Sequence, residues 1–373
     1  MFRRMETDKR LLSLDTLRGF DMIFIMGFAA IIEALCRLFP GGDQSWLCVQ
    51  MSHAAWDGLR HHDTIFPLFL FIAGISFPFS YAKQLSRGVS RGQVYAKIFR
   101  RALILVLLGL VYNGILEWHL ATQRFPSVLA RIGLAWMFAA LLQINCKPRT
   151  RAVVAVALLV GYWLLLRFVP APDAPGADPF SREGNLVGYI DRMIWPNHIF
   201  QRGLFDPEGL LSVVPAVVTA MLGMFTGEFV RLDESRLSGG RKSLYMALVA
   251  LGMLGVGLLW SLVFPVNKAL WSSSFVLVVG AYSLGLFALF YYLIDVRGWK
   301  DWTKFFEVIG LNSITIYMAQ KLLPFGAANK FLLGGTAKLL PPEWGALLLS
   351  VGYFALSWLF LWFLYKKRVF LKV

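Results

Sequence analysis

Long apolar stretches recur along the whole chain and are separated by polar segments. Stretches of about 17 to 25 apolar residues are long enough to cross the roughly 30 Å hydrocarbon layer of a membrane as helices, which satisfy their own backbone hydrogen bonds. The pattern predicts an all-α, polytopic membrane protein with ten helices, at residues 14–39, 64–82, 98–118, 128–144, 153–169, 210–230, 244–264, 271–294, 305–323 and 345–365.

The polar segments between these stretches predict the orientation of the chain. Lys and Arg gather in every second segment, and positively charged segments resist translocation. We therefore expect both termini on the cytoplasmic side, and the segments 52–63 and 170–209 on the opposite side. The first of these basic groups comprises Arg3, Arg4, Lys9 and Arg10.

A cleaved signal peptide is the alternative explanation for the first apolar stretch. That stretch is long, lacks a convincing A-x-A cleavage site and carries Asp21 and Glu33. We therefore expect it to be retained as a helix.

The composition agrees with a membrane protein and leaves no separate soluble domain. Of 373 residues, 57% are hydrophobic and only 16% are charged, whereas a soluble domain carries about a quarter charged residues. The net charge of +15 follows from the basic segments and indicates topology rather than nucleic-acid binding. We treat residues 1–373 as one transmembrane domain whose longest outer loop is 170–209.

Three kinds of site have little support in the sequence. His53, His61, His62 and Asp63 lack the H-x-x-x-H or C-x-x-C spacing of a preformed zinc site, so we expect no metal. No G-x-S-x-G elbow for a nucleophilic serine and no glycine-rich phosphate loop occurs. Cys36 and Cys48 both fall near the outer face, where they could form a disulfide or stay as thiols.

Ionisable residues inside predicted membrane helices are costly and therefore indicate functional sites. Asp15 and Arg18 stand one turn apart, so they share a helix face and can pair. Such a pair could bind a ligand or merely anchor the helix at the interface. Arg131 lies one turn into an apolar helix and needs a carboxylate, a carbonyl or an anionic ligand as its partner.

Several motifs, in this order along nearly the whole chain, resemble those of the heparan-α-glucosaminide N-acetyltransferase family. They are "LLSLDTLRGF", "SHAAWDGLRHHDTIFPLFLFIAG", "RFPSVLARIGLAW", "GYIDR", "FDPEGLLSVVPAVVTAMLG", "FPVNKALWSSSF" and "GLNSITIYM". The resemblance implies a transmembrane acyltransferase that uses cytosolic acetyl-CoA to acetylate the glucosamine of a glycan on the far side of the membrane. It also implies that the family's conserved histidine is His53 here, and that the chain belongs to a bacterial inner membrane.

The chemistry of that reaction agrees with a histidine at this place. Acetyl transfer from a thioester to an amine needs removal of an ammonium proton, and imidazole can accept a proton near neutral pH. His53 could act as this general base or could carry the acetyl group itself. Asp57 or Asp63 could orient its ring, although either could instead cap the following helix, as we expect for Asp63. His61 and His62 are expected to be solvated.

Coenzyme A brings phosphate groups that bind arginine and lysine. We expect Arg18 with its neighbour Asp15, Arg101 and Arg131 to hold the coenzyme on the inner side, with the pantetheine arm between helices. Contact with lipid phosphates explains Arg101 equally well.

An amino sugar has hydroxyl groups and an ammonium that carboxylates can accept hydrogen bonds from. We therefore expect the acceptor near Asp206 and Glu208, although both could simply cap the next helix. The other candidates for the acceptor site are Asn267, Lys268, Trp56 and Arg124, and Trp56 could instead belong to an interfacial aromatic belt.

The sequence thus predicts a membrane acetyltransferase, whose partners are acetyl-CoA, an amino-sugar acceptor and lipid, and which could form a homodimer. The rival interpretation is an amino-sugar permease without acyl transfer. A permease often shows inverted repeats, and no clear repeat is present.

Overall fold

The structure is a computed structural model that describes residues 11–200 and 203–371. Within this part the chain forms helices joined by turns and loops, with no strand. The prediction of an all-helical chain is therefore confirmed for the described residues. The basic residues Arg3, Arg4, Lys9 and Arg10, as well as Arg202, lie outside them.

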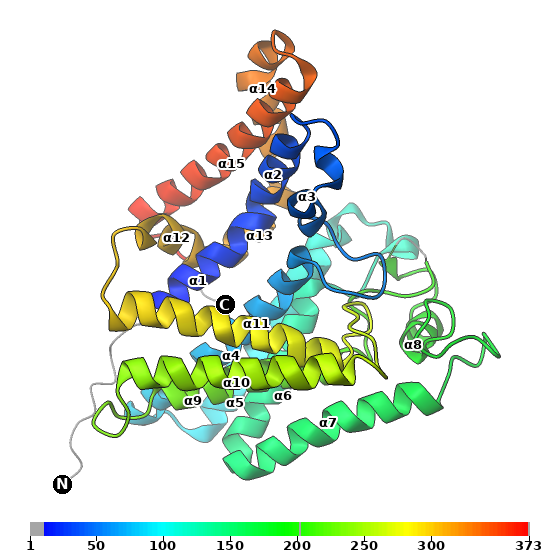
Figure 1. The fold of residues 1–373 in the computed structure, drawn as a ribbon, viewed down its shortest axis with the longest axis vertical. Coiled ribbons are helices and arrows are strands. Elements are labelled where there is room, and N and C mark those ends of the chain that lie inside the picture. Colours follow the sequence, from blue (N-terminus) through cyan, green and yellow to red (C-terminus); the bar gives the residue numbers. More distant parts are fainter. Residues whose placement is uncertain (1–10, 201–202, 372–373) are drawn as a thin grey trace.

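The helices follow one another closely along the chain (Figure 1). They are α1 (Leu12–Ile23), α2 (Ala29–Cys36), α3 (Trp46–Gln50), α4 (His61–Ser86), α5 (Arg91–Tyr112), α6 (Val128–Asn145), α7 (Pro148–Phe168), α8 (Leu186–Ile194), α9 (Val213–Val230), α10 (Gly239–Trp260), α11 (Ser273–Phe290), α12 (Thr303–Gly310), α13 (Ser313–Leu322), α14 (Phe325–Lys338) and α15 (Pro342–Lys366). A π-helical turn, Phe24–Phe28, joins α1 to α2, and another, Tyr291–Val296, extends α11.

Eight continuous helical segments of the described chain are long and apolar enough to cross a membrane. The sequence predicted ten such helices. The predicted helices at 98–118 and 305–323 are not among these eight, each for a different reason. α5 is long, but it carries Lys97, Arg100 and Arg101 within its apolar stretch. The helix expected at 305–323 is broken into α12 and α13, because Asn312 leaves helical geometry and its side-chain amide donates to the carbonyl of Val369.

Three helices of the structure were not predicted. The short α3 lies between the first two predicted helices. α8 lies within the long segment 170–209, which is therefore not a structureless loop. α14 follows α13 and packs against α15, and the two rise together beside α2 at the top of Figure 1.

The centre of the bundle is formed by α4, which packs closely against α9. Gly223 makes this approach possible, because a Cβ atom there would lie 2.1 Å from the carbonyl oxygen of Phe71. Small residues at such crossings let helices meet at backbone distance in a membrane. α7 and α10 lie at the edge of the bundle and expose apolar side chains such as Val153 and Leu259.

The helix directions define two faces of the bundle. The histidine face holds the segment 52–60 and the loop 261–272 between α10 and α11. It also holds the first turn of α4, the first turn of α6 and the first turn of α9. The basic face holds the end of α4, the start of α5, and the turns before α7, α10 and α12. Cys36 and Cys48 near the histidine face are free thiols.

Candidate active site

His53 and Asp63 form the centre of the candidate site on the histidine face. Asp63 lies in the first turn of α4 and is 1% exposed. Its Oδ2 accepts the backbone N–H groups of Ala54 and Arg60, each at 3.1 Å, and its Oδ1 lies 2.7 Å from His53 Nδ1. The same carboxylate therefore closes the start of the helix, as expected from the sequence, and holds the imidazole.

Lys268 completes this group from the loop between α10 and α11. Its Nζ lies 3.1 Å from His53 Nδ1 and 3.5 Å from Asp63 Oδ1. Burial lowers the pKa of Lys268, although the charges of Asp63 and Glu208 oppose this change. All these contacts use Nδ1 of His53, which leaves Nε2 as the ring nitrogen that can meet a substrate.

His61 and His62 are the first residues of α4 and are half-buried rather than fully solvated, contrary to the expectation. The His62 ring meets the His53 ring edge to face at 4.7 Å, and His61 packs on Phe24. Neither Nδ1 atom has a hydrogen-bond partner among the described residues. No group of three or more His, Cys, Asp or Glu side chains in the described ranges is arranged to hold a metal ion.

Asp57 does not orient the His53 ring. Its Oδ1 accepts a hydrogen bond from Asn267 Nδ2 at 3.1 Å, and Asn267 also accepts from the backbone N–H of Leu270. Asn267 is fully buried, so this pair fixes the loop that carries Lys268 rather than facing a ligand. The physical reason is that the chain turns between residues 53 and 60, and this turn separates Asp57 from the ring.

Trp56 also has a structural partner. Its indole N–H donates to the carbonyl of Phe180 at 2.9 Å, and its ring meets Phe205 edge to face. It therefore packs against the segment 170–209.

Arg124, Asp206 and Glu208 form a second group on the histidine face. Arg124 Nε donates to Asp206 Oδ2 at 2.8 Å, and Arg124 Nη2 donates to Glu208. Burial alone lowers the pKa of Arg124, but the hydrogen bonds and charges of the two carboxylates outweigh it and raise that pKa. Asp206 is fully buried and also accepts the backbone N–H groups of Phe200 and Glu208, so Glu208 is the carboxylate better placed for a ligand.

Arg131 lies beside this group and not beside Arg18. Its Nη2 donates to Ser212 Oγ, and its guanidinium stacks over Trp271 at 4.9 Å. The structure therefore does not bring Arg131 together with Arg18, and a role of Arg131 in binding the coenzyme stays a prediction. α6 begins on the histidine face, so a residue one turn into it lies at that end of the membrane.

Arg18 and Arg101 lie together deeper in the bundle, toward the basic face. Arg18 forms the expected pair with Asp15 at 3.5 Å, and its Nη2 donates to Ser76 on α4. Arg101 stacks over Trp136 at 4.2 Å, and its buried Nε has no partner among the described residues. The charges of Arg18 and Arg101 act on each other, which favours an anion near both.

A small apolar cavity of about 40 Å³ is bordered by Leu129 and Ile132, the neighbours of Arg131 on α6. Its walls come from α1 and the π-helical turn after it, α4, α6 and α13, through residues that include Met22, Phe66, Phe69, Ile132 and Tyr317. It has the apolar lining that a slender chain between helices would need.

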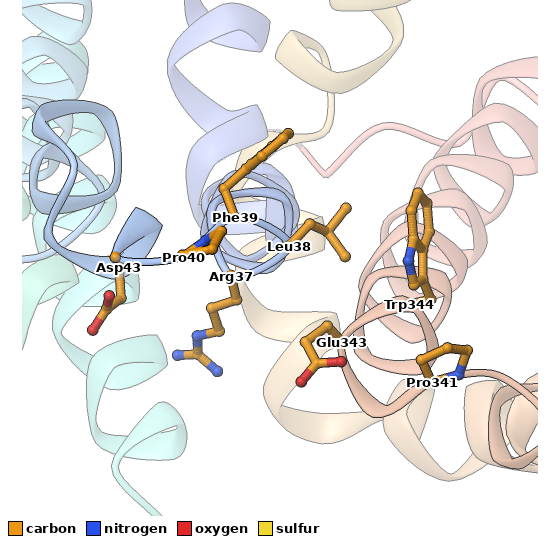
Figure 2. A pocket seen from close by; sticks show the side chains of 9 residues that line it. Arg37, Leu38, Phe39, Pro40, Asp43, Pro341, Glu343 and Trp344 are labelled. Carbon is orange, nitrogen blue, oxygen red and sulfur yellow. The ribbon is translucent and has the colours of Figure 1, made fainter.

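A larger hollow of about 570 Å³ lies away from His53, where the end of α2 meets the start of α15 (Figure 2). Arg37, Asp43, Glu343 and Trp344 surround it. It lacks the buried charges of the histidine face, so size alone does not make it the candidate site.

Asp191 and Arg192 do not pair with each other. Arg192 forms an ion pair with Asp173, whereas the buried Asp191 accepts the backbone N–H of Leu210 at 3.0 Å. Burial raises the pKa of Asp191 to about 7, although that hydrogen bond opposes the change. Asp191 thereby fastens α8 to the segment that carries Glu208.

Sequence reasoning missed Ser212 and Trp271 as neighbours of Arg131. Ser212 follows "FDPEGLL" directly, and Trp271 is close to Lys268 in "VNKALW". Both polar motifs were recognised, but their position relative to α6 depends on helix packing that the sequence does not display.

The fold and this site define an integral, multi-pass, all-helical membrane protein with a cluster of buried charges at one face. The chain is 28% identical over 421 aligned residues to heparan-alpha-glucosaminide N-acetyltransferase of Homo sapiens, covering 98% of this chain and 60% of the relative. It is 26% identical over 434 residues to the protein of the same name from Mus musculus, covering 99% of this chain and 61% of the relative. No family model matches the chain.

The two relatives support membership of the family that the motifs indicated. The chain spans about 60% of the length of these curated relatives. The similarity therefore applies to nearly all of this chain but to only part of each relative.

Proposed function

We propose that this protein transfers the acetyl group of acetyl-CoA to the amine of a glucosamine-type sugar across the membrane in which it lies. Acetyl-CoA would enter from the basic face, which we assign to the cytoplasm, and the sugar would bind at the histidine face. The observation that carries the proposal is the 2.7 Å contact between His53 Nδ1 and the buried Asp63. The two acetyltransferase relatives support the reaction class.

His53 is the proposed general base. Asp63, as a buried carboxylate, accepts the Nδ1 proton and thereby directs the lone pair of Nε2 outward. The side chain of His53 is 55% exposed, so an amine can reach it. An acetyl group carried on Nε2 uses the same geometry, and it would appear as ping-pong kinetics.

The coenzyme and the acceptor have separate places in this proposal. Arg18 and Arg101 would bind phosphate groups, since guanidinium groups form strong hydrogen bonds with phosphate oxygens. The apolar cavity between α1, α4, α6 and α13 would hold part of the pantetheine arm. Glu208 would accept hydrogen bonds from the sugar ammonium or hydroxyl groups.

The test uses purified full-length protein in detergent with acetyl-CoA and a panel of amino sugars, followed by free thiol release and mass spectrometry of the product. We expect acceptor-dependent release of CoA that is lost in His53→Gln. His119→Gln is the matched control, because His119 is an exposed histidine outside the site. Equal CoA release by His53→Gln and by the unmodified protein would contradict the assignment of His53.

The permease interpretation makes a different prediction for the same protein. Vesicles without acetyl-CoA would then take up amino sugar. If the vesicles take up sugar and the protein forms no acetylated product, the acetyltransferase interpretation is wrong and the permease interpretation is correct.

A further inference from the structure

Arg131 has unused hydrogen-bonding capacity inside the protein. It is 1% exposed, and its Nε and Nη1 atoms have no hydrogen-bond partner in the part of the chain that the structure describes. Its one side-chain hydrogen bond goes to Ser212, which in turn donates to the carbonyl of Gly209. A buried guanidinium with unpaired N–H groups is costly, so a partner absent from the polypeptide is expected.

Nearby carboxylates do not supply that partner. Asp206 and Glu208 act on Arg131 through their charge, but both form their ion pairs with Arg124. No carboxylate among residues 11–200 and 203–371 lies within ion-pair distance of Arg131. Arg131 therefore keeps two nitrogen atoms, Nε and Nη1, available to donate to an oxygen atom.

Arg131 lies next to the His53 group. Its guanidinium stacks over Trp271 at 4.9 Å and over Phe66 at 5.8 Å, and these two rings meet edge to face. Phe66 follows Asp63 by one turn of α4, and Trp271 ends the turn that Lys268 begins. Both rings are thus anchored one turn away from the residues that touch His53 Nδ1.

The apolar cavity lies beside Arg131. Phe66 lines it together with Leu129 and Ile132, which flank Arg131 on α6. A thioester whose pantetheine arm lies in this cavity would present its carbonyl between Arg131 and His53. Phe66 and Trp271 are both buried, so the surroundings of Arg131 are of low polarity, which strengthens a hydrogen bond from Arg131 to a developing charge.

We propose that Arg131 is the oxyanion-binding residue of the acetyl transfer, donating hydrogen bonds to the thioester carbonyl oxygen. This inference rests on the proposed function and adds a catalytic residue to it. The substrate amine, after losing a proton to His53, forms a bond to the carbonyl carbon, and the carbonyl π electrons move to the oxygen held by Arg131. When the C=O bond re-forms, the C–S bond breaks, its electron pair stays on sulfur, and a proton from the nitrogen neutralises the thiolate.

Arg131→Gln tests this role, with Arg101→Gln as the matched variant. Both residues are arginines stacked over a tryptophan inside the bundle, but only Arg131 lies at the histidine face. We expect Arg131→Gln to lower kcat by about 100-fold to 1000-fold while the Kd of CoA, which has no acyl carbonyl, stays nearly unchanged. Arg101→Gln should instead weaken CoA binding. A monodisperse elution profile and an unchanged melting temperature establish that each variant is folded.

A spectroscopic readout separates polarisation of the carbonyl from a structural role. Acetyl-CoA labelled with ¹³C at the carbonyl is bound to His53→Gln, which prevents turnover, with and without Arg131→Gln. We expect a lower carbonyl stretching frequency when Arg131 is present. Arg131→Lys, which keeps the charge and loses the planar fork, should recover part of the frequency shift and of kcat.

The outcomes distinguish this inference from the function on which it rests. An unmodified protein that acetylates no amino sugar overturns both. An active unmodified protein whose folded Arg131→Gln variant has the same kcat and the same carbonyl frequency overturns the role of Arg131 alone.

Discussion

His53 Nδ1 lies 2.7 Å from Asp63 Oδ1, and the other oxygen of this carboxylate holds the backbone of Ala54 and Arg60. The proposed base is therefore fixed to the first turn of α4, a largely buried helix at the centre of the bundle. An exposed loop histidine gains a defined position in this way. Catalytic groups need such support, because small displacements of a reacting atom cost large factors in rate.

Replacement of Asp63 by Asn should separate its two roles. The Asn side-chain oxygen still accepts backbone N–H groups at a helix start, so the melting temperature should fall only slightly. The ring of His53 loses its charged acceptor, so kcat for acceptor-dependent CoA release should fall about 100-fold or more.

Asp57→Asn is the matched control for Asp63→Asn, because Asp57 is in the same segment but accepts from Asn267. Its kcat should stay close to that of the unmodified protein. If the two variants lose the same activity, the ring-orienting role of Asp63 is wrong.

Lys268 should help to position the ring of His53. Its Nζ lies 3.1 Å from His53 Nδ1 and 3.5 Å from Asp63 Oδ1. Lys268→Met removes both contacts, so kcat for acceptor-dependent CoA release should fall about tenfold, the value of one charge-assisted hydrogen bond, while the Kd of CoA stays nearly unchanged. Lys330→Met, on the exposed surface of α14, should leave kcat close to that of the unmodified protein. An unchanged kcat in Lys268→Met would remove Lys268 from the site.

The sequence was sufficient for the class of fold because apolar length alone reports a membrane-spanning helix. It was insufficient for the break at Asn312, since that break depends on a hydrogen bond to Val369, distant in the chain. α14 was missed because Lys330 and Lys338 resemble loop residues until the packing against α15 is known.

The candidate site was predictable where it is local in sequence. His53 and Asp63 stand in one motif, and the structure brings them together. Arg131 was assigned to the wrong level of the membrane because its charge suggested a phosphate partner, although the predicted direction of its helix already placed it at the outer end. The contact between Asp57 and Asn267 joins two distant segments, and no local pattern indicates it.

Glu208 and Asp206 should respond differently to loss of charge. Glu208 retains some exposure and has one ion pair with Arg124, so Glu208→Gln should raise the KM for amino sugar by about tenfold, the value of one charge-assisted hydrogen bond. Asp206 is fully buried and pairs with the same arginine, so Asp206→Asn should lower the melting temperature instead. Initial rates at varied sugar concentration and thermal unfolding of both variants measure this difference. An unchanged KM in Glu208→Gln would remove Glu208 from the acceptor site.

Asp191 should make the stability of the protein depend on pH. Burial raises its folded pKa to about 7 from an ordinary value of 3.8, so the folded protein binds a proton that the unfolded chain releases. The stabilisation is fully present below about pH 4 and is lost as the pH rises through about 7, at about 1.4 kcal/mol per pH unit between them.

Asp191→Asn, which resembles the protonated acid and can still accept from Leu210, should lack this dependence and should be more stable than the unmodified protein at pH 8. Asp173→Asn, in the exposed ion pair with Arg192, is the control and should keep it. Thermal unfolding in detergent between pH 5 and 8 measures the slopes, and parallel curves for Asp191→Asn and the unmodified protein would refute the titration of Asp191.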